Sequence, residues 1–294
     1  MPLLDHPTNP LTDPTRVKAA LNSMGLRPTK GMGQNFLIDP EPLRLALAAA
    51  AVGPEDVVVE VGPGLGVLTW ELLRAAGRVI CVELDKRLAA RLRVEFPSDR
   101  LSLIEEDVLN VAPAAMLAAA NLPAATPYKL IANIPYAITS PLLRHFLEAS
   151  SPPELMMVLM QWEVAERITA KPGSLSILAH SVQLYATAEI VGRVPSSAFL
   201  PPPAVDSALV LMRRREQPSV ATPVHALFKV IRAGFSQARK KLANSLAGGL
   251  AGQGYAKDQV MAAIVAAGID PNLRAEVLTL DQWAALTAAL GMER

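Results

Sequence analysis

The stretch VVVEVGPGLG, from Val57 to Gly66, joins an apolar run of strand length to a turn that contains three glycines. A short apolar run that is bounded by glycine and proline predicts a strand buried on both faces. Glycines let the backbone turn sharply and approach a ligand closely. Ligands of open α/β sheets bind where strands end in this way. The stretch therefore predicts the first strand of an α/β sheet and a ligand site at its end.

Outward from this stretch, apolar runs alternate with stretches rich in alanine and leucine that have a helical period. We expect strands at 57–61, 79–83, 101–106, 128–133, 155–161 and 208–215, and helices at 68–77, 85–96 and 141–150. Strand, helix and strand at this spacing predict a mostly parallel sheet that is covered on both faces. Gly77 fits the end of the first of these helices, where glycine takes the left-handed conformation at little cost.

The sequence divides into three parts. The first is a leader at 1–29, whose start, MPLLDHPTNPLTDPTR, contains four prolines and favours a loose segment. The α/β domain follows at 30–215. After EQPSVATP the pattern is helical up to residue 290, so we expect a smaller, all-helical domain at 216–294.

Composition limits the class of protein. The chain has 294 residues, of which 51% are hydrophobic, which is enough for a sizeable core. We see no apolar run long enough to span a bilayer and no secretory signal, so we expect no membrane partner. Cys81 is the single cysteine, which excludes a disulfide within the chain and fits the cytoplasm. The four histidines lack the spacing of metal ligands, and we expect no metal.

The net charge of +1 hides an asymmetry. Residues 213–294 hold 11 Lys and Arg against 6 Asp and Glu, a net of +5, and the remainder has a net of −4. A basic end on a nearly neutral chain is typical of proteins that bind polyanions. Within it, ARKKLANSL (238–246) is predicted to be a helix with one basic stripe, formed by Arg239, Lys240 and Lys241. The stripe either contacts phosphates or is a solvated charged face.

The glycine turn predicts the kind of ligand. Gly62, Gly64 and Gly66 alternate with other residues, and a dinucleotide fingerprint would need a further glycine where Val67 stands. The spacing is instead that of sites for a nucleoside joined to methionine. A tight turn without a ligand is the alternative.

Two acidic residues near the ends of the next two strands support a nucleoside site. Glu83 ends the strand at 79–83, 21 residues after Gly62, where a carboxylate can accept both hydroxyls of a ribose. Asp107 follows the strand at 101–106 and could accept a hydrogen bond from the amino group of an adenine. Alone, such an acid could be a helix N-cap, as Asp85 and Asp107 both precede helical stretches. Together with the glycines, they indicate an adenosine-containing cofactor.

The segment ANIPY closes the strand at 128–133. The side-chain oxygen of Asn133 and the carbonyl of Ile134 can accept hydrogen bonds, and Pro135 fixes the local backbone. Tyr136 offers a ring for base stacking, which is worth about 1–3 kcal/mol per base. Together they can hold an exocyclic amine by its two hydrogens and aim its lone pair at an electrophilic methyl group. Orientation is what such a site must supply, and no strong general base is required.

Eight motifs, in order, resemble the ribosomal RNA adenine dimethyltransferase family. They are KGMGQNFLIDP, VVEVGPGLGVLT, VICVELDKRLAARL, EEDVL, ANIPYAITSPLL, QWEVAERI, VPSSAFLPPPAVDSALV and FSQARKKLANSL. The resemblance implies a Rossmann-like class I methyltransferase domain with S-adenosylmethionine as methyl donor. It also implies dimethylation of two adjacent adenosines near the 3′ end of 16S rRNA. The implied partner is 16S rRNA in the small ribosomal subunit or its precursor, and the protein is expected to be a cytoplasmic monomer.

By position, the resemblance also assigns roles to residues. The implied donor contacts are Asn35, Leu37, Gly62, Gly64, Glu83, Asp107, Val108 and Asn133. Within this set, Gly62 lies beside the methionine part, Glu83 holds the ribose, and Asp107 with Val108 holds the donor adenine. Asn133 would touch both donor and target. Phe199 would face Tyr136 across the flipped target base, with core packing as the alternative.

The sequence departs from the family on the expected RNA side. Trp162 and Ala204 stand where the family commonly has lysine, Ala137 replaces a polar residue, and the loop near Gly173 is shorter. Two other functions remain open: a large-subunit (23S) rRNA adenine methyltransferase of the antibiotic-resistance type, and a non-catalytic assembly factor. The helical C-terminal domain favours the small-subunit enzyme over the former, and the intact site motifs oppose the latter.

Overall fold

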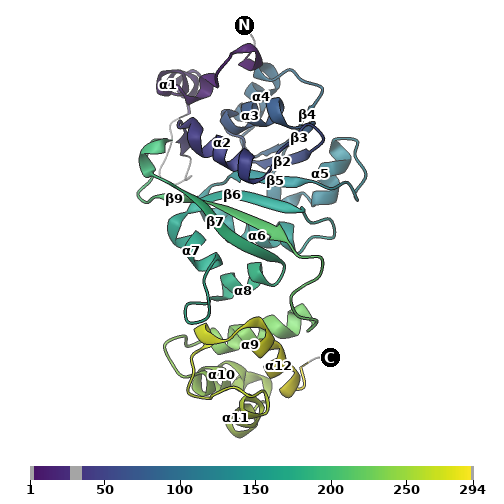
Figure 1. The fold of residues 1–294 in the computed structure, drawn as a ribbon, viewed down its shortest axis with the longest axis vertical. Helices are drawn as coiled ribbons and strands as arrows, with labels where there is room; N and C mark the ends of the chain where they lie inside the picture. The colour runs from purple at the N-terminus through teal and green to yellow at the C-terminus, as the bar shows by residue number, and fades with distance from the viewer. Residues whose placement is uncertain (1–2, 27–34, 293–294) are drawn as a thin grey trace. The chain divides into compact units, whose positions relative to one another are not determined.

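The computed structural model describes residues 3–26 and 35–292 of the chain (Figure 1). By its internal contacts the chain forms two compact units. Unit 1 lies within 1–165 and 187–214, and unit 2 lies within 166–186 and 215–294. Residues 166–186 thus group with the helical unit, whereas the division of the sequence assigned them to the α/β domain.

Unit 1 is built on a sheet of seven strands in the order β4-β3-β2-β5-β6-β9-β7 (Figure 1). Their bounds are β2 Val57–Val61, β3 Arg78–Glu83, β4 Leu101–Glu105, β5 Lys129–Asn133, β6 Leu155–Gln161, β7 Ala186–Val194 and β9 Ser207–Arg214. The first five strands in this order are parallel, and β9 is antiparallel to β6. The predicted α/β class with a mostly parallel sheet is confirmed, and each of the six predicted strands is correct to within one residue at either end.

Helices flank this sheet (Figure 1). In unit 1 they are α1 Pro14–Ser23, α2 Pro40–Ala49, α3 Val67–Ala75, α4 Lys86–Glu95, α5 Pro113–Ala119 and α6 Thr139–Leu147. The helix α7 Trp162–Ile168 crosses the boundary between the units in the sequence, and α8 Ile177–Gln183 belongs to unit 2. The predicted helices at 68–77, 85–96 and 141–150 correspond to α3, α4 and α6. Two residues on each of two short strands, β1 Phe36–Leu37 and β8 Phe199–Leu200, pair antiparallel in a separate small sheet.

The N-terminal segment is not loose where it is described. Trp70 Nε1 on α3 donates to the carbonyl of Leu3 at 2.8 Å, and Asn9 Nδ2 donates to the carbonyl of Val67 at 2.8 Å. Leu11 is buried in the main core. Two of its prolines begin regular elements: Pro10 begins the 3-10 turn η2 Pro10–Thr12, and Pro14 begins α1. Another 3-10 turn, η1 Leu3–Asp5, precedes them. The expectation of a loose leader is therefore wrong for residues 3–26, and Lys30 to Gln34 of the first quoted motif lie outside the described residues.

Gly77 does not take the left-handed conformation that we expected at the end of α3. The helix ends at Ala75, and the amides of Gly77 and Arg78 both donate to the carbonyl of Asp56 at 3.1 Å. A Cβ at position 77 would collide with the carbonyl oxygen of Pro54. Glycine is needed there because two backbone segments approach closely, not because of the sign of φ.

Unit 2 is helical, as predicted for the C-terminal part. After residue 215 it contains α9 Val224–Phe235, α10 Leu242–Leu250, α11 Lys257–Ala266 and α12 Leu280–Ala289. Its core surrounds Trp283, whose Nε1 donates to Nε2 of His180 on α8 at 3.1 Å. Burial lowers the pKa of His180 to about 4, so the ring stays neutral and can accept this bond. In the described parts of both units, no helix has the length and apolar character needed to cross a bilayer.

Gly66, which caps α3, should be intolerant of a side chain. Its φ is +89°, and a Cβ there would overlap the ring of Phe96 and come within 2.9 Å of Leu92. We expect Gly66→Ala to lower the free energy of unfolding by about 1–3 kcal/mol beyond the cost of backbone strain, because overpacking displaces the core. Urea denaturation measures this. Gly25→Ala is the matched control, since Gly25 has φ +63° and open space around its Cβ position. Equal losses in the two variants would contradict the overlap.

Candidate functional site

A cavity opens at the carboxyl ends of β2, β3 and β5, where open α/β sheets bind ligands. It brings together nine of the residues that the sequence predicted for the site. They are Asn35, Leu37, Gly62, Gly64, Glu83, Asn133, Ile134, Pro135 and Tyr136. These residues come from four segments that are far apart in the chain, so the cavity is a product of the sheet topology.

The glycine turn forms one wall of the cavity. Gly62 and Gly64 have φ values of +65° and +60°, which a residue with a side chain adopts only at a cost. A Cβ on Gly64 would lie 3.4 Å from the ring of Phe36, which also lines the cavity. The turn therefore presents bare backbone to a ligand. Phe36 was missed in the sequence because nothing local places β1 against the turn.

Glu83 ties the end of β3 to this turn. Its Oε2 accepts from the amide of Gly64 at 3.0 Å, and its Oε1 accepts from the amide of Asp85 at 2.9 Å. The residue is 6% exposed, and burial raises the pKa of the carboxyl while these two hydrogen bonds oppose the rise. Each carboxylate oxygen retains a lone pair for a further donor, such as a ribose hydroxyl.

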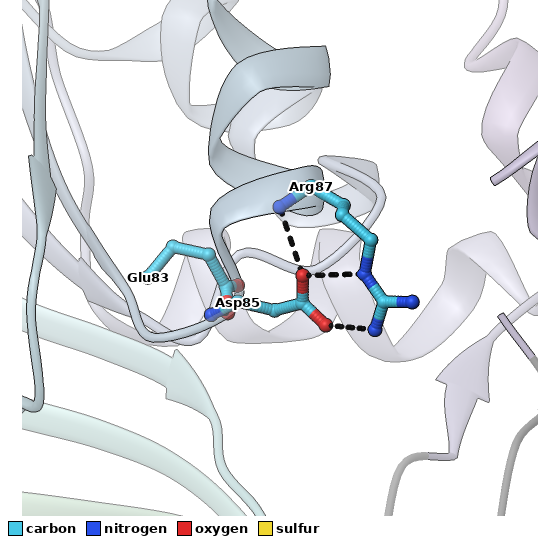
Figure 2. Close-up of polar contacts among 3 residues, drawn as sticks. All are labelled: Glu83, Asp85 and Arg87. Carbon is cyan, nitrogen blue, oxygen red and sulfur yellow. Dashed lines mark hydrogen bonds and ion pairs between the residues drawn. The ribbon is translucent and has the colours of Figure 1, made fainter.

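The N-cap alternative holds for Asp85 and not for Glu83. Asp85 caps α4 by accepting from the amide of Arg87 at 2.8 Å, and the Arg87 side chain binds both of its oxygens. That pairing lowers the pKa of Asp85. Figure 2 shows the Asp85 carboxylate turned towards Arg87, and Glu83, unlike Asp85, is among the residues that line the cavity. Glu83 is thus the carboxylate that this strand end gives to the cavity.

Asp107 and Val108 do not line this cavity. Asp107 caps the 3-10 turn η3 Val108–Asn110 by accepting from the amide of Leu109 at 3.0 Å, and Val108 is buried. Asp107 therefore acts as an N-cap through one of its two carboxylate oxygens, Oδ1. Contact of either residue with a donor adenine stays a prediction.

The Asn133–Tyr136 segment also lines the cavity. Asn133 ends β5, and Tyr136 begins the 3-10 turn η4 Tyr136–Ile138. A Cβ on Gly62 would lie 3.9 Å from Cδ of Pro135, so a side chain at position 62 would reach this segment. The Tyr136 hydroxyl forms a 2.7 Å hydrogen bond with Oγ of Ser207 on β9, which fixes the ring. Burial raises the pKa of Tyr136, so its hydroxyl is protonated at neutral pH.

Phe199 lies in the main core cluster and is 2% exposed. It pairs with Leu37 between β8 and β1 and is not among the residues that line the cavity. This placement agrees with the packing alternative. A role across a flipped base stays a prediction, which this position does not favour.

Glu60 is a cavity residue that the sequence reading missed. It is 1% exposed, and its Oε2 accepts from the Thr69 hydroxyl at 2.7 Å and from the Cys81 thiol at 3.3 Å. Burial, with a smaller contribution from the charge of Glu83, raises the pKa of Glu60 to about 7. Burial also raises the pKa of Cys81, which keeps the thiol protonated as a donor. The available signal was an acid inside an otherwise apolar strand, VVVEV.

The predicted basic stripe of Arg239, Lys240 and Lys241 is exposed. Contrary to the prediction, these residues do not lie within a helix. Arg239 and Lys240 belong to the turn after α9, and Lys241 is the N-cap position of α10. Lys241 Nζ donates to Oδ1 of Asn272 at 2.7 Å. The expected stripe is therefore a basic turn that precedes the helix.

A mostly parallel sheet with a glycine turn after β2, a carboxylate ending β3 and an Asn-Ile-Pro-Tyr segment after β5 defines a Rossmann-like methyltransferase. The model of the family described as ribosomal RNA adenine dimethylase matches residues 26–290. The chain belongs to this family.

Relatives and solved structures agree with this membership. The chain is 44% identical over 278 residues to a Dehalococcoides mccartyi protein named ribosomal RNA small subunit methyltransferase A, covering 91% of this chain and 90% of that protein. It is 41% identical to a Streptomyces coelicolor protein of the same name, over 93% and 95% of the two chains.

Among solved structures, a dimethyladenosine transferase from Plasmodium falciparum has a TM-score of 0.70 at 25% identity and covers 85% of this chain and 95% of its own. The 23S rRNA methyltransferase ErmE has a TM-score of 0.65 at 29% identity, with coverages of 87% and 100%.

Glu60 should make stability depend on pH. Because its pKa is raised to about 7 from an ordinary value near 4.5, the folded chain holds a proton that the unfolded chain releases in this window. The free energy of unfolding should therefore fall as the pH rises from about 4.5 to 7. The total fall should be about 1.4 kcal/mol for each unit by which folding raises the pKa of Glu60. We expect Glu60→Gln to flatten this dependence in urea denaturation. Glu41→Gln, at an exposed site on α2, is the control. A slope that Glu60→Gln leaves unchanged would show that another group titrates.

Proposed function

We propose that the chain transfers methyl groups from S-adenosylmethionine to the N6 amines of two adjacent adenosines near the 3′ end of 16S rRNA, giving N6-dimethyladenosines. One observation carries this proposal. The glycine turn and the Asn133–Tyr136 segment line one cavity, and a Cβ added to Gly62 would lie 3.9 Å from Cδ of Pro135. A donor held by the first and an amine held by the second would meet there. The small-subunit names of the curated relatives support the choice of substrate.

The residues of the cavity fit a cationic nucleoside donor. Among the described residues that line it, those of the Asp, Glu, Lys, Arg and His types are Glu60 and Glu83, both acids that a cation favours in their ionised form. S-Adenosylmethionine, when bound, supplies an electrophilic methyl group on a positively charged sulfur. We propose that Glu83 holds the ribose and that bare backbone at Gly62 and Gly64 receives the methionine part. Asn35 and Leu37 would complete the donor site, with Asp107 and Val108 near the adenine.

The Asn133–Tyr136 segment would promote the transfer by holding the target amine in a fixed orientation. The lone pair of an adenine amine is delocalised into the ring, so the amine is a poor nucleophile unless it is held in position. The side-chain oxygen of Asn133 and the carbonyl of Ile134 would accept its two hydrogens, and Tyr136 would stack on the base. Tyr136 does not act as a base, because burial raises its pKa further from neutrality. A flipped base in an RNA loop reaches the site at a lower cost than one in a duplex.

The basic turn of unit 2 would bind the RNA backbone. Arg239 and Lys240 are exposed, and no described residue forms an ion pair with them. Phosphate contacts position a nucleic acid without specifying its sequence. We propose that the helical part, with this turn, binds the small subunit or its precursor in the cytoplasm, and that the protein acts as a monomer.

The direct test is transfer of radiolabelled methyl groups to unmethylated small subunits. We expect N6-dimethyladenosine as the product nucleoside and primer-extension stops near the 3′ end of 16S rRNA. Asn133→Ala and Tyr136→Ala should lower the rate at least about 100-fold because the amine loses its orientation, while RNA binding remains measurable. Tyr136→Phe is the control, since it keeps the ring and loses only the bond to Ser207.

Three results would overturn parts of this proposal. Stops in 23S rRNA instead would favour the alternative that the fold of ErmE keeps open. Binding to subunits without any methyl transfer would indicate a non-catalytic assembly factor. Undiminished transfer by both alanine variants would remove the Asn133–Tyr136 segment from the mechanism.

Neutralising the basic turn should weaken RNA binding. We expect the triple change Arg239→Gln, Lys240→Gln and Lys241→Gln to lower the affinity for small subunits. It should also reduce the slope of log K against log salt by up to about 0.9 per lost phosphate contact. Binding assays across a salt series measure both. Lys257→Gln, at an exposed position on α11, serves as the control. A slope equal to that of the unchanged protein would show that this turn faces solvent in the complex.

A further inference from the structure

In the sheet of unit 1, β9 lies between β6 and β7 (Figure 1). Three side chains at or next to the ends of these strands form a cluster. Arg193, near the end of β7, places its guanidinium carbon 4.8 Å from the centre of the Trp162 ring. Asp206, just before β9, binds the same guanidinium through Nε and Nη2, both at 2.9 Å from Oδ2. We call these three residues the Arg193 platform.

The platform is anchored to the backbone on two sides. Oδ1 of Asp206 accepts from the amide of Ser196 at 2.9 Å, and the carbonyl of Asp206 accepts from the amide of Trp162 at 3.0 Å. The guanidinium is therefore held from one edge by a carboxylate and from one face by an indole. The Arg193 side chain is nevertheless 61% exposed. A planar cation is thus fixed in place while much of it still faces solvent.

This platform lies beside the acceptor side of the cavity. Ser207 follows Asp206 directly, and its hydroxyl forms the 2.7 Å hydrogen bond with the Tyr136 hydroxyl. Ser207 also pairs with Gln161 in the sheet, and Trp162 is the next residue. Asp206 and Trp162 of the platform are therefore next in sequence to the paired residues Ser207 and Gln161. Of these two, Ser207 makes the contact that fixes the Tyr136 ring.

Stability alone does not account for such an arrangement. Exposed ion pairs contribute little to the free energy of unfolding, because water screens them and ordering the side chains costs entropy. RNA-binding sites, in contrast, stack unpaired bases on aromatic rings and on guanidinium planes. A guanidinium that is already oriented loses less freedom when a ligand binds.

We infer that the Arg193 platform stacks a nucleobase that flanks the target adenosine in the single-stranded substrate. This inference rests on the proposed function, because it takes the Tyr136 side of the cavity as the place of the target base. It gives Trp162 a role in the substrate site, because its indole ring lies against the guanidinium of Arg193.

The experiment uses the full chain and unmethylated small subunits, with affinity, KM, kcat and salt dependence measured together. Arg193→Gln and Arg193→Lys should each weaken binding and raise KM about tenfold, since lysine keeps the charge and loses the plane. Trp162→Leu should do the same with an unchanged salt slope, because it removes no charge. For all three variants we expect kcat and the affinity for S-adenosylmethionine, measured by calorimetry, to stay as in the unchanged protein.

Arg144→Gln is the matched control. Arg144 on α6 is also 61% exposed and is paired with a carboxylate, Glu148. We expect this variant to bind subunits with unaltered affinity, and thermal melting checks that every variant is folded.

Several results would overturn the inference. Full affinity of Arg193→Lys together with a loss in Arg193→Gln would identify a phosphate contact instead of a stacked base. Unchanged KM in Trp162→Leu, or in both Arg193 variants, would leave the cluster a surface ion pair. If Trp162→Leu fails to fold, the two Arg193 variants still decide the outcome. Failure of the unchanged protein to bind subunits or to transfer methyl groups would overturn the proposed function, which is a separate result.

Discussion

The hydrogen bond between the Glu83 carboxylate and the amide of Gly64 is the contact on which the site depends. It joins the ends of two neighbouring parallel strands at the one edge of the sheet where side chains from several strands can meet. Below the same turn, Phe96 and Leu92 fill the space next to Gly66. The turn is thus held by the hydrogen bond to Glu83 and by packing against Phe96 and Leu92. A ligand meets a surface that is already in place, so little ordering entropy opposes binding.

Local patterns predicted the strands and the glycine turn, because period, length and turn residues are properties of neighbouring residues. The misses have a common cause in tertiary contacts. Gly77 is fixed by the carbonyl of Pro54, and the N-terminal segment is ordered by contacts with α3, more than 50 residues away. The edge strand β7 was not predicted because its residues alternate irregularly between buried and exposed. In the site, Glu83 was found from its place at a strand end, whereas Glu60 needed knowledge of Thr69 and Cys81.

The two units differ in the charge that they present. The cavity of unit 1 carries two buried carboxyls with raised pKa values, so admitting a cation would relieve the cost of holding them ionised. Unit 2 carries an exposed basic turn, in which Arg239 and Lys240 form no ion pair with a described residue. The attraction of a polyanion to such a turn is screened by salt. A net charge near zero conceals this difference.

The path of the chain constrains how this protein could be divided or recombined. It leaves unit 1 near residue 165, returns near 187 and leaves again near 214, so the helical unit is not a terminal appendage. Removing everything after residue 215 would strip Leu184 and His180 of the core around Trp283 and expose an apolar α8. A single crossover in a gene could therefore not exchange the helical unit intact between homologues. Inheritance of the two units as one block is the expected evolutionary outcome.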